Sequence, residues 1–129
     1  MKKWLILIGI LLAAGGGYIG LELGSVWNRL GSEVIVLEAM DRILPGIDNE
    51  IAKLAHRIFK KQGLDFRTNT FVDSAKRNGD KCVVAIKDGK PIECDRVLLS
   101  TGRTPATDDL GLESIGLETD ARGFIAVDN

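Results

Sequence analysis

The chain has 129 residues, of which 45% are hydrophobic and 27% charged, and its formal net charge is −1. This length suits one domain around one hydrophobic core, and the near-zero net charge argues against a nucleic-acid partner, which usually requires a basic surface. The longest apolar run, Trp4 to Ala14, is too short for a transmembrane helix, which needs roughly 20 residues. We therefore expect a protein with neither a nucleic-acid nor a membrane partner.

The first half of the chain alternates predicted strands and helices. Its elements, in order, are strand 4–14, helix 18–30, strand 33–38, helix 49–62 and strand 64–67. The strands are nearly continuous apolar runs, as in a parallel sheet that is covered on both faces. Gly31 and Gly63 would end the two helices, and Asp48 would cap the start of the second. The expected apolar face of that second helix consists of Ile51, Leu54, Ala55, Ile58 and Phe59.

The second half changes to short strands separated by turns. NGD and DGK are hairpin-type turns, and they separate the strand-like runs 71–76, 81–87 and 91–94. A buried strand 97–100 follows, then the loop TGRTP, a helical turn around LGLESIG and a last strand FIAV. The sequence therefore predicts an α/β fold, a Rossmann-like βαβαβ parallel sheet with a small antiparallel β-meander.

A glycine-rich turn joins the first strand to the first helix. Residues 15–20, GGGYIG, fit the pattern G-x-G-x-x-G of dinucleotide-binding turns. In that pattern Gly15 would allow the tight turn, Gly17 the close approach of a pyrophosphate and Gly20 the packing of helix on strand. The free amides at the helix start would then face the phosphates.

An acidic residue stands where such a site needs one. Glu38 ends the second predicted strand, about 20 residues after the glycines, where a carboxylate accepts hydrogen bonds from the adenosine ribose. A carboxylate there repels a 2′-phosphate, and the nearest arginine, Arg42, lies in the following loop. We therefore expect NAD in preference to NADP.

The first 14 residues allow more than one interpretation. MKKWLILIGILLAA has the charge and the apolar run of a secretory leader. If it is instead part of the fold, either Trp4 to Ile8 forms the strand and residues are inserted before the glycines, or ILLAA forms the strand.

The cysteines and the histidine do not form a metal-binding pattern. Cys82 and Cys94 lack a C-x-x-C spacing, and no cysteine or histidine lies near His56 in sequence. We predict no metal, a half-buried or surface role for His56, and free thiols in a reducing compartment. A disulfide between neighbouring strands is the alternative.

Several quoted segments occur in the order found in one enzyme family. GGGYIGLELGSVWNRLGSEVIVLE, DRILPGID, RIFKKQGLDF, CDRVLLSTGRTP and LGLESIGLETDARGFIAVD resemble the flavin-linked disulfide oxidoreductases, and within them the dihydrolipoamide dehydrogenases. The resemblance implies an NAD-binding domain over residues 1–103 and a partial return into the FAD domain over residues 104–129. It also implies a cytoplasmic protein, or a mitochondrial matrix protein in a eukaryote.

The resemblance gives roles at the nucleotide to particular residues. These are Gly15, Gly16, Gly17, Tyr18, Ile19, Gly20, Leu21, Glu22, Glu38, Val72 and Gly102. Glu38 would hold the ribose, Val72 would line the adenine pocket and Gly102 would lie near the nicotinamide. Tyr18 would lie beside the nicotinamide slot, and Glu22 would pair with a lysine of the FAD domain.

Other parts of the family pattern are not matched in these residues. The redox dithiol, both FAD motifs and the histidine–glutamate proton relay have no counterpart, and His56 does not match that histidine. In the family, electrons pass from dihydrolipoamide through the dithiol and FAD to NAD. We therefore expect the chain alone to bind NAD(H) without turnover, to have no catalytic residue, and to have the FAD and interface domains of a parent enzyme as partners. The alternative is a stand-alone NAD-binding or sensing module.

Overall fold

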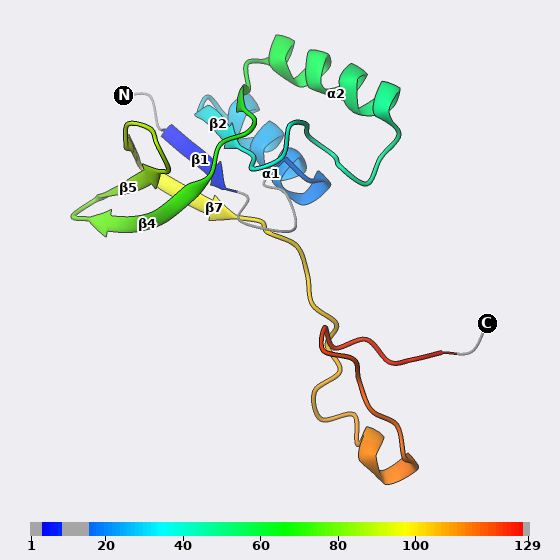
Figure 1. The fold of residues 1–129 in the computed structure, drawn as a ribbon. Helices are drawn as coiled ribbons and strands as arrows, with labels where there is room; N and C mark the ends of the chain where they lie inside the picture. Colours follow the sequence, from blue (N-terminus) through cyan, green and yellow to red (C-terminus); the bar gives the residue numbers. More distant parts are fainter. Residues whose placement is uncertain (1–3, 9–15, 128–129) are drawn as a thin grey trace.

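A four-stranded parallel sheet forms the centre of the molecule. The computed structural model describes residues 4–8 and 16–127. Figure 1 shows the fold, in which β1 (Trp4–Ile8), β2 (Glu33–Leu37), β3 (Asp65–Arg67) and β7 (Arg96–Leu99) form the sheet in the order β3-β2-β1-β7. The α/β class and the parallel sheet predicted from the sequence are confirmed.

The strand nearest the amino terminus lies between two others. Trp4–Ile8 pairs along its full length with β2, from Trp4 opposite Glu33 to Ile8 opposite Leu37, and on its other edge with β7. Of the two runs that could have formed this strand, the first therefore occupies the sheet. Residues 9–14, the rest of the expected strand, and Gly15 lie outside the described residues.

The two helices begin and end close to the predicted positions. α1 spans Tyr18–Arg29, and Gly31 follows its C-cap with a φ of +91°. α2 spans Asn49–Gln62, with Asp48 Oδ1 accepting hydrogen bonds from the amides of the first turn and Gly63 in the left-handed region at its end. Local capping chemistry therefore determines both ends of α2.

The predicted antiparallel meander is present as a second sheet. It consists of β4 (Val72–Asn78), β5 (Lys81–Ile86) and β6 (Ile92–Cys94), in that order. These bounds differ from the expected ones by at most two residues.

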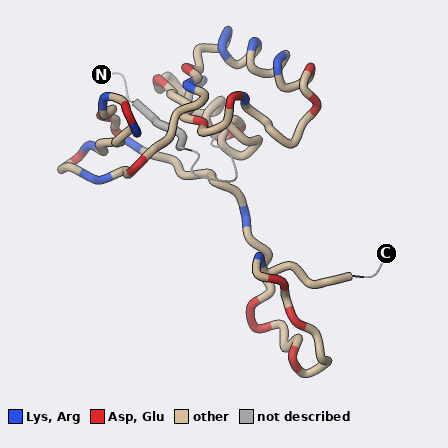
Figure 2. The backbone as a smooth tube through the Cα atoms, viewed as in Figure 1, with Lys and Arg blue, Asp and Glu red and all other residues tan. Residues whose placement is uncertain are grey.

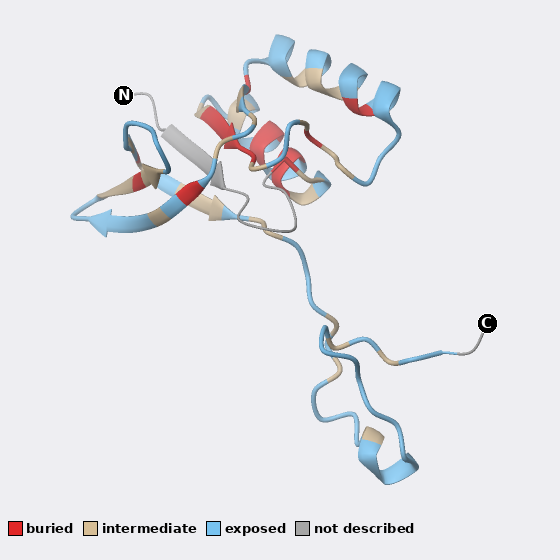
Figure 3. Ribbon diagram, viewed as in Figure 1, coloured by how far each residue is buried: buried red, intermediate tan, exposed pale blue. Residues whose placement is uncertain are grey.

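The two faces of β2 are covered by different layers. Val34 and Val36 form a cluster with Leu64, onto which Phe59 of α2 packs. Ile35 and Leu37 face the opposite way and form a second cluster with the meander residues Val72, Val84 and Cys94. Figure 3 shows that buried residues concentrate around β2 and α1. The result is three layers, with helices, parallel sheet and meander in that order, as a strand that is apolar on both faces requires.

The helices carry apolar side chains on their outer surfaces. The sequence places five apolar residues on one face of α2, but in the structure only some of them are turned toward the core. Phe59 packs inward next to buried Ala52, whereas Ile51, Leu54 and Ile58 are exposed. On α1, the exposed apolar residues include Leu23, Val26, Trp27 and Leu30.

His56 is half-buried against Phe66, with ring centroids 4.6 Å apart.

The chain leaves the sheet after β7. Residues 104–127 extend away from it and include the 3₁₀ turn η1 (Leu112–Ile115) (Figure 1). The expected last strand FIAV is reduced to a single bridge between Thr119 and Ile125, because no sheet lies beside it. Figure 2 shows acidic residues spaced along this tail. Of the helices in the described ranges, none has the length and apolarity needed to cross a bilayer.

Candidate functional site

Gly16 is held tightly at the turn before α1. Its amide donates to Glu38 Oε2 at 2.9 Å, and its carbonyl accepts from the amide of Leu44 at 2.9 Å. A Cβ added at Gly16 would lie 2.9 Å from Ile43 Cγ2 and 3.2 Å from Glu38 Oε2. No side chain fits there without movement of buried neighbours, so the surroundings favour a glycine at Gly16, the position between the first two glycines of the motif.

Glu38 connects the end of β2 to this turn. It is only 1% exposed, and its two oxygens accept from different amides, Oε2 from Gly16 and Oε1 from Met40, the latter at 2.9 Å. The main chain of Glu38 makes two further hydrogen bonds. Its amide donates to the carbonyl of Arg67, and its carbonyl accepts from the amide of Thr70. A carboxylate oxygen can accept two hydrogen bonds, so each of the two retains acceptor capacity.

The start of α1 has the electrostatic character of an anion site. Gly17 is its N-cap, and no side chain caps this end and no acid occupies the first turn within the described residues. The first helical bond is Leu21 N to Gly17 O at 3.0 Å, which leaves the amides of Tyr18, Ile19 and Gly20 without intrahelical acceptors. Such amides and the helix dipole attract phosphate groups.

The other residues of the first helical turns lie in different surroundings. Leu21 is a buried core residue and Gly20 is also buried, whereas Tyr18 and Glu22 are exposed and Ile19 is half-buried. Tyr18 and Glu22 are therefore the two of this group that are free to meet a ligand or another domain, and Leu21 supports the helix.

Val72 and Gly102 lie in surroundings that differ from each other. Val72 is packed in the cluster that contains Leu37, where it is 8% exposed, so in this structure its side chain contributes to the core. Gly102 follows β7, is exposed and has a φ of +120°, which explains why a glycine stands there. Their roles at a nucleotide stay predictions.

Three residues near the site were not singled out from the sequence. Ile43 and Leu44 belong to the loop after β2 and press against Gly16, and Leu44 has an unusual φ of +52°. Ser100 directly follows β7, and its hydroxyl is buried and has no hydrogen-bond partner among the residues that the structure describes. Its position could have been inferred, because the strand order reverses between β1 and β7 and open parallel sheets bind ligands at that reversal.

The side chain of Arg42 is hydrogen-bonded to its own loop and to the start of α2. Its guanidinium donates to Asn49 Oδ1 and, at 2.7 Å, to Pro45 O. These bonds hold the loop that carries Ile43 and Leu44 against the start of α2, so Arg42 has a structural role in this arrangement.

Known proteins are similar to this chain in sequence and in fold. The chain is 51% identical over 123 residues to the dihydrolipoamide dehydrogenase of Chaetomium thermophilum, covering 91% of this chain and 24% of that protein. It is 49% identical over 119 residues to the dihydrolipoyl dehydrogenase of Cupriavidus necator, covering 89% of this chain and 25% of that one. The chain thus spans about a quarter of the length of these relatives.

Solved structures of related proteins have the same fold as this chain. The HOCl-induced flavoprotein disulfide reductase RclA from Escherichia coli matches with a TM-score of 0.81 and 32% identity, over 98% of this chain and 27% of that chain. LpdA from Mycobacterium tuberculosis matches with a TM-score of 0.81 and 28% identity, over 98% and 26% respectively. The family of pyridine nucleotide-disulphide oxidoreductases matches residues 10–129, and the chain belongs to that family.

Proposed function

We propose that this chain is the NAD(H)-binding unit of a dihydrolipoyl dehydrogenase-like oxidoreductase. The observation that carries the proposal is the contact of Gly16 with Glu38, which joins the glycine turn to the acid expected at the ribose. Membership of the family and the dihydrolipoyl dehydrogenase names of the relatives support the same conclusion.

The residues of this site fit a dinucleotide in three respects. The amides at the start of α1 would bind the pyrophosphate, and the glycine turn would let it approach. The remaining acceptor sites of Glu38 would receive the ribose hydroxyls. The buried hydroxyl of Ser100 offers a further hydrogen bond at the reversal of strand order. When bound, NAD supplies a nicotinamide ring that accepts hydride.

The same geometry favours NAD over NADP. The buried carboxylate of Glu38 would repel a 2′-phosphate, and Arg42 is committed to Asn49 and Pro45. A preference for NADP would need a free cation beside the ribose.

The proposal includes the absence of turnover by this chain alone. Dihydrolipoyl dehydrogenase activity requires a redox dithiol and FAD, and the cysteines of this chain, Cys82 and Cys94, lie in the meander. The partners of the chain would accordingly be NAD(H) and the flavin-binding and interface domains of the enzyme.

Calorimetric titration of the folded chain with NADH tests the binding proposal. We expect saturable binding of NADH, weaker binding of NADPH, and loss of affinity in Gly17→Val, which places a side chain where the pyrophosphate approaches. Gly46→Ala is the matched control, because a Cβ there meets no atom of the described residues within 4 Å. Absence of NADH binding by a chain with an intact far-ultraviolet circular dichroism spectrum would refute the proposal.

A second experiment separates the enzyme unit from a stand-alone module. The chain is mixed with separately expressed flavin-binding and interface segments of a relative, and NADH-dependent dye reduction is measured. Restored dye reduction supports the enzyme unit. NADH binding without any restoration supports the stand-alone module instead.

A further inference from the structure

Two cysteines lie directly opposite each other on neighbouring strands of the meander. Cys82 on β5 is the register partner of Cys94 on β6. Both side chains are on the face that packs on the parallel sheet, since Cys94 belongs to the core cluster of Ile35 and Leu37 and Cys82 packs against that cluster. Opposite residues of an antiparallel pair have Cα atoms roughly 4.5–5.5 Å apart, inside the range that a disulfide spans.

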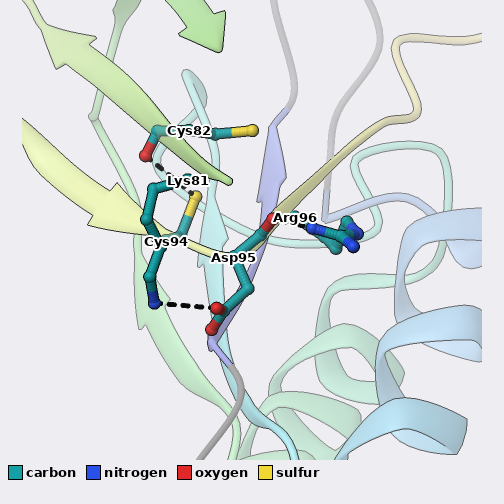
Figure 4. Close-up of polar contacts among 5 residues, drawn as sticks. All are labelled: Lys81, Cys82, Cys94, Asp95 and Arg96. Atoms are coloured by element: carbon teal, nitrogen blue, oxygen red, sulfur yellow. Dashed lines mark hydrogen bonds and ion pairs between the residues drawn. The ribbon is translucent and has the colours of Figure 1, made fainter. Parts of the chain in front are cut away.

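An ion pair joins the two strands beside the cysteines. Lys81 precedes Cys82 and Asp95 follows Cys94, and Lys81 Nζ lies 2.7 Å from Asp95 Oδ1. Figure 4 shows this pair beside the two cysteines, with Lys81 on β5 and Asp95 directly after β6. The pairing of β5 with β6 places the cysteines opposite each other, and the ion pair adds a contact at the same end of the two strands.

The two thiols differ in accessibility. Cys82 is half-buried, whereas Cys94 is 1% exposed. Burial, and secondarily the neighbouring Cys82, raises the pKa of the Cys94 thiol to about 11. The Cys94 thiol donates to the carbonyl of Cys82 at 3.7 Å, and Figure 4 shows its sulfur directed across to that strand. An oxidant from solvent therefore reaches Cys82 first, and Cys94 is positioned to follow.

We propose that Cys82 and Cys94 form a thiol-oxidation site that accepts small disulfides and closes into a cross-strand disulfide. The thiolate of Cys82 attacks one sulfur of the oxidant; the oxidant's S–S bond breaks and one thiolate leaves and is protonated. Cys94 then loses its proton and attacks Cys82 Sγ; the bond from Cys82 to the oxidant's remaining sulfur breaks, and the second thiolate leaves and takes up that proton. Two protein thiols lose two electrons in total, and one small disulfide is reduced to two thiols.

Closure requires a change in side-chain geometry. In Figure 4 the sulfur of Cys82 points away from that of Cys94, so Cys82 must rotate about χ1 before the sulfurs meet. Both cysteines are free thiols in the described arrangement. The described arrangement is therefore the reduced form, and closing the disulfide requires an oxidant.

The test treats the folded full chain with oxidised glutathione, blocks remaining thiols with iodoacetamide and digests the chain with trypsin without reduction. Cleavage after Lys87 separates the two cysteines into peptides 82–87 and 88–96. We expect these peptides to appear joined, with a mass lower by about 2 Da than the sum of the two thiol peptides. Dithiothreitol should separate them again.

Single-cysteine variants define the order of events. Cys94→Ser should accumulate a glutathione mixed disulfide on Cys82, because the second step is missing. Cys82→Ser should leave Cys94 unmodified in the folded chain and modified in urea. The oxidised native chain should also have a thermal midpoint shifted upward by a few degrees relative to the reduced chain, and neither variant should show that shift.

Three results would overturn the proposal. These are glutathione on both cysteines of the native chain without joined peptides, modification of Cys94 before Cys82, and joined peptides that arise only between two chains. Joined peptides at a rate independent of chain concentration would exclude the last of these.

Discussion

At the scale of single residues, Gly16 is a position that tolerates substitution poorly. A Cβ there would lie 2.9 Å from Ile43 Cγ2 and close to the carboxylate of Glu38. Gly16→Ala should therefore destabilise the chain by about 1–3 kcal/mol, as overpacking of a dense site does. Urea denaturation measures the change, and Gly46→Ala, which meets no atom within 4 Å, should be nearly neutral. Equal stability of the two variants would mean that the loop of Ile43 does not press on the turn.

Glu38 provides a test of the hydrogen bonds themselves. Both of its oxygens accept from main-chain amides, Gly16 and Met40. Glu38→Gln keeps the size but replaces one acceptor with a donor, so one buried amide loses its partner, at a cost of about 1–3 kcal/mol. NADH affinity should fall together with stability, whereas Glu118→Gln in the exposed tail should change neither. Calorimetry and urea denaturation of the two variants measure both effects.

At the scale of elements, α2 shows what local chemistry can specify. Asp48→Ala should cost about 1 kcal/mol, because two first-turn amides lose the side-chain oxygen that accepts from them. Asp48→Asn should retain most of the stability, because the amide oxygen can still accept. The comparison is made by thermal or urea denaturation, and a loss in Asp48→Asn as large as in Asp48→Ala would indicate that the cap is not the cause.

The elements that the sequence predicts well are those determined by neighbouring residues. Asp48 and Gly63 bound α2 through their own conformations, and NGD and DGK separate the strands of the meander through turn geometry. Those predictions need no knowledge of distant contacts.

The predictions that the sequence left open or missed depend on residues far apart in the chain. The strand role of Trp4–Ile8 depends on pairing with both β2 and β7, which start 29 or more residues later. The exposure of Ile51 and Leu54 depends on which side of α2 meets the sheet. In the site, Glu38 follows from strand position and spacing, whereas the contacts of Ile43 and Leu44 with Gly16 exist only once the loop after β2 folds back.

At the scale of the whole molecule, both helices present apolar side chains to solvent. On α1 these include Val26, Trp27 and Leu30, and on α2 they include Ile51 and Leu54. Contiguous apolar surface is uncommon on proteins that stay monomeric. The relatives are about four times as long as this chain, which leaves most of their length free to cover such faces.

Self-association of the chain should therefore depend on these side chains. Leu30 is 72% exposed at the C-cap of α1, where a cation also interacts favourably with the helix dipole. Leu30→Lys combined with Leu54→Lys should reduce association in sedimentation velocity and leave the thermal midpoint nearly unchanged. Leu21→Lys is the contrasting control, because Leu21 is buried and its replacement should unfold the chain. If the double variant associates as strongly as the parent, the outer faces of the helices are not the surfaces that join the chains.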